Sequence, residues 1–203
     1  ARRVGHYKWI EMRLFEVLGG WVATVPEIDV KLRLGTHCYH HAWHSELWHK
    51  RLPELREMNP ENLTGPPNDE LVAFVDAMTE PEAPDLTIEK LVGVYRVLIP
   101  HKIAAYTYHR NNTSRITDAP TIRSLDFALA DEFDDWRDGE MLIQSLIETD
   151  DTVKVGGRYE AKDGKIAAVE TFVSKTGETA ELRKQTQEEN VGWYSGITSD
   201  MFS

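Results

Sequence analysis

The stretch PEIDVKLRLGTHCYHHAWHSELWHKRLPELREM, residues 26–58, predicts one long helix with an unusual run of histidines. Four of these histidines are spaced at i, i+3, i+4 and i+7, so they share a single helical face: His37, His40, His41 and His44. Apolar side chains extend the same stripe toward both ends of the helix: Val30, Leu34, Trp48, Leu52 and Leu55. We therefore expect the imidazole rings to interrupt an apolar seam and to point into a core.

Three further stretches predict long helices, over residues 6–22, 87–110 and 119–148, because apolar residues recur along them at helical spacing. A shorter helix is predicted near 70–78, within a proline-rich connection. Pro100 falls inside the helix over 87–110, where proline costs about 3 kcal/mol unless the backbone adjusts, so we expect a kink there. Four long helices in one chain predict an all-α domain arranged as an up-down bundle.

Composition and charge restrict the classes of function. The 203 residues are enough for one substantial core, and a net charge of −11 argues against a nucleic-acid partner. No apolar run approaches the roughly 20 residues that span a bilayer, so no membrane partner is expected. The one cysteine, Cys38, excludes an internal disulfide framework and favours a reducing compartment. Together these features predict a soluble, cytoplasmic protein.

The last part of the chain differs in character from the rest. Three short segments look extended, and two glycine-containing pairs between them look like turns: 153–155, 158–161 and 166–173, with Gly156-Gly157 and Asp163-Gly164 as the turns. We expect a helical domain over residues 1–150, followed by a C-terminal extension over 151–203 that has β-hairpin character.

Three segments of the chain resemble a family of bacterial proteins with a ferritin-like domain. They are residues 11–55, which begin EMRLFEVLGGWVATVPEIDV, residues 91–111, LVGVYRVLIPHKIAAYTYHRN, and residues 118–136, DAPTIRSLDFALADEFDDW. The resemblance extends over roughly residues 6–146 and implies a four-helix bundle. Such bundles hold metal with one Glu from each of two helices and a Glu-x-x-His pair from each of the other two, and carboxylate-bridged irons held in this way activate dioxygen.

The chain departs from the ligand pattern of that family at three places. His40 stands where the second helix usually has an acidic residue. Asp135 stands where the histidine of the fourth-helix motif is usual, three residues after Glu132. The third helix has no carboxylate between Glu89 and Asp118. The chain has therefore lost carboxylates and gained imidazoles relative to the usual ligand set.

The remaining residues still predict a metal site where the helices face one another. Imidazole together with carboxylate suits non-haem iron, with copper or manganese as alternatives. Side chains from helices about 8–10 Å apart can share one ion. The candidate ligands are Glu11, His40, His44, Glu132 and Asp135. The other acidic residues of the fourth helix are expected on a solvated face: Asp131, Asp134 and Asp138.

The expected function is that of a metal-dependent oxidase or oxygenase that combines dioxygen with a small organic molecule. Iron, as a single ion or a pair, is the expected cofactor. The candidate catalytic residues are His41 and Tyr106. The residues expected to line the substrate cavity are His37, Trp48, Tyr95 and His109. Tyr39 and Trp43 project from the far side of their helix, where they can form the interface of a homodimer or pack under the C-terminal tail.

Other interpretations fit the same residues. The histidines can line a metal-free cavity for acid–base catalysis or small-molecule binding, because histidine titrates near neutrality. Glu132 can pair with a histidine or with Lys102, and Glu11 can form an ion pair with a neighbouring helix. Glu16 replaces Glu11 if the first helix is rotated. A purely structural protein, whose tail adds strands to a partner, is a third alternative.

Overall fold

The computed structural model describes residues 1–79, 86–149, 153–162 and 165–175, and most of them are helical, as the sequence predicts. The long helices are α1 (Arg2–Thr24), α2 (Ile28–Leu55) and α7 (Ala119–Thr149). A fourth long rod consists of three consecutive pieces: α5 (Thr87–Val92), the π-helix η2 (Gly93–Leu98) and α6 (Ile99–Asn112). Two shorter helices precede this rod: α3 (Pro60–Leu63) and α4 (Asp69–Thr79). Within the described part of the chain, no helix combines the length and apolar character needed to cross a membrane.

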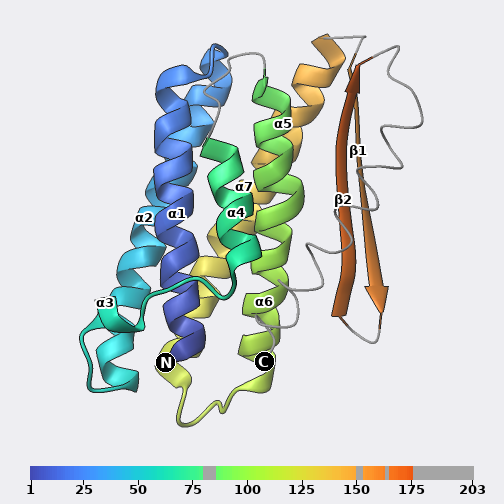
Figure 1. Cartoon of the computed structure of the whole chain (residues 1–203). Coiled ribbons are helices and arrows are strands. Elements are labelled where there is room, and N and C mark those ends of the chain that lie inside the picture. The colour runs from blue at the N-terminus through green and yellow to red at the C-terminus, as the bar shows by residue number, and fades with distance from the viewer. Residues whose placement is uncertain (80–85, 150–152, 163–164, 176–203) are drawn as a thin grey trace.

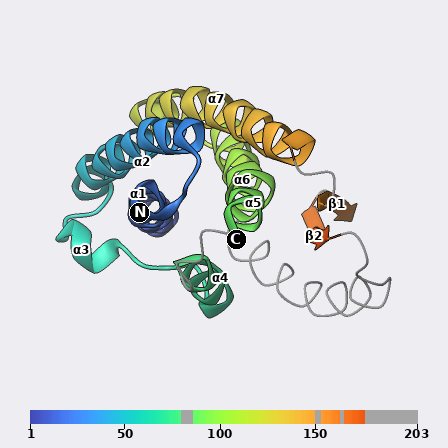
Figure 2. The ribbon, with the colours of Figure 1, turned by 90° about the horizontal axis from the view of Figure 1, so that it is seen from above.

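The four long rods lie side by side (Figure 1). Viewed from above, α1 is flanked by α2, α4 and the α5–α6 rod, while α7 lies along α2 and α6 (Figure 2). The helices α1 and α2 run in opposite directions, but α3 and α4 then carry the chain back, so that α5 starts at the same end as α2 (Figure 1). The α5–α6 rod therefore runs parallel to α2, not antiparallel as a simple up-down order predicts.

The interior consists of two apolar clusters with a polar layer between them. One cluster contains Leu14 and Leu34, and the other contains Tyr7 and Trp48. Along α1 the buried Glu11 lies between members of the two clusters, and the same order holds along the other long rods. Burial of apolar side chains contributes about 25 cal/mol per Å² of surface, so the clusters hold the rods together on either side of the layer. The polar groups of the layer must then satisfy one another, because water does not reach them.

The predicted irregularity at Pro100 takes the form of a π-helical turn. In η2 the backbone N–H of Ile99 bonds to the carbonyl of Val94, five residues earlier. Pro100 has no N–H, and its ring would clash with the carbonyl four residues before it in a regular α-helix. The wider π turn directly before the proline accommodates both constraints.

Close packing of the rod against α7 depends on one glycine. A Cβ atom at Gly139 would lie 2.1 Å from Cγ of Tyr95, far inside any real contact distance. The aromatic ring of Tyr95 therefore lies directly against the backbone of α7, and it is fully buried there. Only glycine leaves room for this approach.

The extended segments of the tail form two antiparallel strands. β1 (Val153–Lys162) pairs with β2 (Lys165–Lys175), with Val153 opposite Lys175. The turn predicted at Gly156-Gly157 is wrong, because both glycines lie inside β1. The turn predicted at Asp163-Gly164 and the tail beyond Lys175 lie outside the described residues.

Candidate functional site

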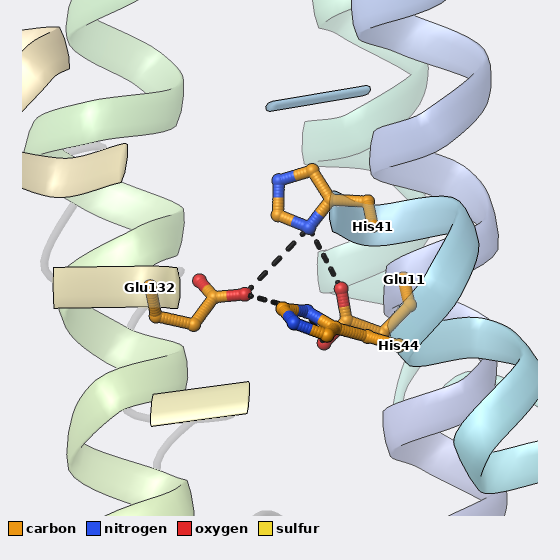
Figure 3. A group of neighbouring side chains, drawn as sticks. All are labelled: Glu11, His41, His44 and Glu132. Atoms are coloured by element: carbon orange, nitrogen blue, oxygen red, sulfur yellow. Dashed lines mark hydrogen bonds and ion pairs between the residues drawn. The ribbon is translucent and has the colours of Figure 1, made fainter. Parts of the chain in front are cut away.

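Four acidic and imidazole side chains meet in the polar layer from three different helices. They are Glu11 of α1, His41 and His44 of α2, and Glu132 of α7 (Figure 3). All four are fully buried, and one ligand-type atom of each lies within 4.8 Å of the others. Among the described residues, no other set of three or more His, Cys, Asp or Glu side chains meets this spacing. Helix α1 has the rotation that the sequence favours, because Glu16 lies on the surface in an ion pair with Arg13.

The donor atoms of the group lie close to one another. His41 Nδ1 lies 2.8 Å from Glu11 Oε2 and 3.6 Å from Glu132 Oε1. His44 Nδ1 lies 3.6 Å from Glu11 Oε1 and 3.4 Å from Glu132 Oε1. Around an ion with bonds of about 2.1 Å, tetrahedral donors are about 3.4 Å apart. The group therefore has ligand types that bind metal, and three of the four distances are close to the tetrahedral value, while the fourth, 2.8 Å, is that of a hydrogen bond.

A lysine from the third rod also reaches this group. Lys102 Nζ donates to Glu11 Oε2 at 2.8 Å and to Glu132 Oε1 at 2.6 Å, and it lies 3.3 Å from His41 Nδ1. The lysine is 1% exposed. Burial alone would lower the pKa of Lys102, but the charges of Glu11 and Glu132 outweigh burial and raise it. Lys102 is therefore an ammonium group bound between two carboxylates.

The charges in the layer stabilise one another. Burial tends to raise the pKa of Glu11, but the positive charges of Lys102 and His44 hold it well below its usual value. Burial tends to lower the pKa of His44, but the charge of Glu11 and a hydrogen bond with Asp131 raise it to about 11. In this structure His44 is therefore an imidazolium and Glu11 a carboxylate.

Aromatic residues close the layer on one side. The hydroxyl of Tyr106 donates to Glu11 Oε1 at 2.5 Å, and burial raises the pKa of Tyr106 well above its ordinary value. The ring of Tyr106 packs edge-on against Tyr7, with centroids 4.5 Å apart. Trp48 lies 5.7 Å from Tyr106, measured between ring centroids, inside the apolar cluster. The predicted catalytic residues His41 and Tyr106 thus belong to the layer, whereas Trp48 packs beneath it.

Histidines of α2 and aspartates of α7 form a ladder alongside this group. The two helices are antiparallel, and three pairs face each other in register: His44 with Asp131 at 3.0 Å, His40 with Asp135 at 2.8 Å, and His37 with Asp138 at 3.6 Å. Asp131 and Asp138 are partly exposed, as the prediction of a solvated face requires, but each also lies against a histidine of α2, which that prediction did not include. The sequence contains a signal for this pairing. The histidines, taken backward from His44, and the aspartates, taken forward from Asp131, are both spaced by four and then three residues.

Two predicted metal ligands, His40 and Asp135, lie in the ladder and not in the group of four. Their hydrogen bond raises the pKa of His40, which is partly exposed, and lowers that of the buried Asp135 against the effect of burial. His40 precedes His41 by one residue, which turns its side chain by about 100° around the helix axis. This rotation points His40 toward α7 and away from Glu11.

The residues predicted to line a substrate cavity are distributed over several places. His37 Nδ1 lies 2.6 Å from the Tyr95 hydroxyl, and burial lowers the pKa of His37. His109 Nδ1 lies 3.2 Å from the Tyr7 hydroxyl, and burial lowers the pKa of His109 to about 4. His109 also lines a separate cavity of about 340 Å³ at the start of α1. These side chains therefore do not surround one common space.

Comparison with known proteins gives one family match. The family model of the flavin-binding part of flavocytochrome c sulphide dehydrogenase matches residues 144–202, which is less than a third of the chain. No curated protein matches the chain. No solved structure matches it. The family match begins after Glu132 and does not include any of the four side chains in the polar layer.

Proposed function

We propose that this chain is an oxidoreductase of ferritin-like architecture whose polar layer holds one transition-metal ion. The observation that carries the proposal is the buried group of Glu11, His41, His44 and Glu132, in which one ligand-type atom of each residue lies within 4.8 Å of the others. Iron is the first candidate, and copper or manganese are alternatives, because mixed imidazole and carboxylate ligands suit these metals. Dioxygen and a small organic molecule are the proposed substrates.

The chain connection supports the architectural part of the proposal. Ferritin-like bundles differ from simple up-down bundles in having one long crossover connection. Here the segment between α2 and α5, which contains α3 and α4, makes such a crossover and leaves the third rod parallel to the second (Figure 1). The segments that resemble the ferritin-like family include parts of all four long rods.

The surroundings of His44 support the metal part. A histidine that binds metal with one ring nitrogen almost always donates its other N–H to a carboxylate, carbonyl or water, which fixes the ring. His44 Nε2 faces Asp131 Oδ2 at 3.0 Å, and its Nδ1 faces the centre of the group. Asp131 therefore orients His44 as a ligand would need to be oriented.

The donor set fits an ion only after two changes. Lys102 Nζ lies on the oxygen atoms that an ion would use, so the amine must move off Glu11 and Glu132 before they can bind metal. His44 must also release a proton, because a metal ligand needs a free lone pair. When bound, iron would supply one-electron chemistry with dioxygen.

The remaining residues have roles that do not depend on the metal. Tyr106 holds Glu11 Oε1 by its hydrogen bond, which limits rotation of that carboxylate. Tyr7 and Trp48 pack beside Tyr106 and keep water from the layer. Among the described residues, the second ring nitrogen of His41, Nε2, is buried without a hydrogen-bond partner, and we propose it as the group that exchanges a proton once a substrate enters the layer.

Elemental analysis tests the proposal. Protein purified without chelator, or loaded with Fe²⁺ under anaerobic conditions, is expected to hold about one equivalent of metal per chain. A His41→Ala variant is expected to lose this metal. A His49→Ala variant is the matched control, since His49 lies on the same helix but is about half exposed and outside the group. Metal content below about a tenth of an equivalent after loading would exclude the metal centre and favour the metal-free histidine site.

A flavin is the second candidate cofactor, and the family match over residues 144–202 favours it. The same preparation tests this candidate, because a bound flavin colours the protein yellow and is released on denaturation. The full chain with His41→Ala separates the two cofactors. If this variant keeps its flavin, the redox chemistry belongs to the C-terminal part, residues 144–203. Absence of flavin after incubation with FAD or FMN would exclude this candidate.

A further inference from the structure

We propose that Lys102 is the resident cation of the polar layer, and that its ammonium group and a metal ion are alternative occupants of one position. The claim that a metal ion binds at this position rests on the proposed function. The claim that the ammonium group occupies it rests on the structure, because Lys102 Nζ contacts both carboxylates of the group at 2.6 and 2.8 Å.

The contacts of Nζ leave no room for a second cation. An ion bonded at about 2.1 Å to Glu11 Oε2 and Glu132 Oε1 would lie on the same side of these oxygens as Nζ does now. His41 Nδ1, a third donor of the proposed site, lies 3.3 Å from Nζ. Two cations so close together would repel each other strongly in a buried setting. Binding of one therefore requires departure of the other.

The lysine also removes the usual dependence of such a layer on metal. Two buried carboxylates without a counter-ion would be costly, and most carboxylate-rich sites meet this cost with the ion. Here the ammonium group of Lys102 lies between Glu11 and Glu132 and offsets one of their two negative charges, while the imidazolium of His44 faces both carboxylates. The third rod thus supplies a cation at the level where the related bundles supply a ligand.

One oxygen of the layer is left unpaired. In the described part of the chain, Glu132 Oε2 is buried and has no hydrogen-bond partner, while Oε1 of the same carboxylate accepts from Lys102. A shift of Nζ from one oxygen to the other would free Oε1 as a ligand and keep the ammonium group paired. The Lys102 side chain has several rotatable bonds, so this shift does not require movement of α6.

Metal affinity measured on matched lysine variants tests the inference. Lys102→Met keeps the apolar stem and removes the charge. Equilibrium dialysis against Mn²⁺ and Zn²⁺ is expected to show binding to this variant that is at least about tenfold tighter than binding to the wild type. The control is Lys8→Met, because Lys8 is also buried but pairs with Glu61 outside the layer, and its metal affinity is expected to equal that of the wild type.

The outcomes separate this inference from the proposed function. Equal metal affinity of the wild type and Lys102→Met would overturn the exchange of occupants and leave the metal centre standing. Failure of both proteins to bind metal would overturn the metal centre together with the exchange.

A measurement on the wild type covers the case in which Lys102→Met does not fold. The buried ammonium group is expected to give a slowly exchanging signal in ¹⁵N NMR of lysine-labelled protein, identified by its loss in Lys102→Arg. Saturation with diamagnetic Zn²⁺ is expected to shift or remove this signal. A signal that stays unchanged while Zn²⁺ binds stoichiometrically would overturn the inference.

Discussion

His44 Nε2 and Asp131 Oδ2 lie 3.0 Å apart, and this pair joins a fully buried ring to a carboxylate at the edge of the bundle. Asp131 contributes to the raised pKa of His44, after the opposing effect of burial and the larger effect of Glu11. The pair therefore controls both the protonation and the orientation of one proposed ligand.

An Asp131→Asn variant is expected to lower the pKa of His44 and to weaken metal binding by about 10–100-fold, the usual effect of removing a carboxylate behind a ligating histidine. NMR titration of the His44 ring and equilibrium dialysis would measure the two effects. Asp134→Asn is the control, since Asp134 lies on the same helix but is exposed and pairs with Arg137. Equal losses in both variants would show that Asp131 has no specific role.

A Tyr106→Phe variant is expected to lower the free energy of unfolding by about 1–3 kcal/mol, because a hydrogen bond to a charged, buried carboxylate is lost. Urea unfolding would measure this change. Tyr39→Phe provides the comparison, since Tyr39 is 67% exposed and its replacement is expected to change stability by less than about 0.5 kcal/mol. A neutral Tyr106→Phe would mean that water replaces the hydroxyl.

The pKa shifts of Glu11 and His44 predict that the folded chain loses stability at low pH and at high pH, respectively. The folded-state pKa of Glu11 lies well below 4.5, so the stability it contributes is present above about pH 4.5 and is lost as the pH falls through the folded-state pKa. The pKa of His44 rises from 6.5 to about 11, so its contribution is complete below pH 6.5 and is lost as the pH rises toward 11. Unfolding measured across this range is expected to show a weaker alkaline loss in His44→Gln. An unchanged alkaline loss in that variant would contradict the assignment.

A Gly139→Ala variant is expected to destabilise the fold by about 1–3 kcal/mol, since the new Cβ would overlap the Tyr95 ring. Gly35→Ala on α2 is the matched control. Beyond its own stretch of helix, no atom of the described residues lies within 4 Å of the Cβ it would add, so alanine there is expected to stabilise the helix by about 0.5–1 kcal/mol. Thermal unfolding of both variants would measure the difference in sign, and stabilisation by both would contradict the packing of Tyr95 on α7.

The sequence predicted the parts of the molecule that follow from helical spacing. The stripe on residues 26–58 indicated that His41 and His44 point inward, and the core faces of α1 and α7 brought Glu11 and Glu132 toward them. These predictions needed only the rotation of each helix about its own axis. The metal itself and the proposed homodimer remain predictions.

The features that the sequence did not predict depend on relations between helices. The sequence indicates Lys102 only as a partner for Glu132, because the rotation of α6 relative to the other rods depends on the π turn before Pro100. The sequence predicts His40 and Asp135 as metal ligands and not as a pair, since their pairing depends on the register of α2 against α7. The direction of the third rod depends on the crossover through α3 and α4. Spacing within one helix does not determine any of these relations.

The wide turn at Gly93–Leu98 determines which side chain α6 presents to the carboxylates. Each residue advances an α-helix by about 100°, so the same chain wound regularly through this segment would swing Lys102 around the axis and off Glu11 and Glu132. The buried carboxylates of Glu11 and Glu132 would then have the imidazolium of His44 as their positively charged partner, without the ammonium group. The identity of the cation in the protein's interior is thus decided by a backbone irregularity that ends four residues before the lysine.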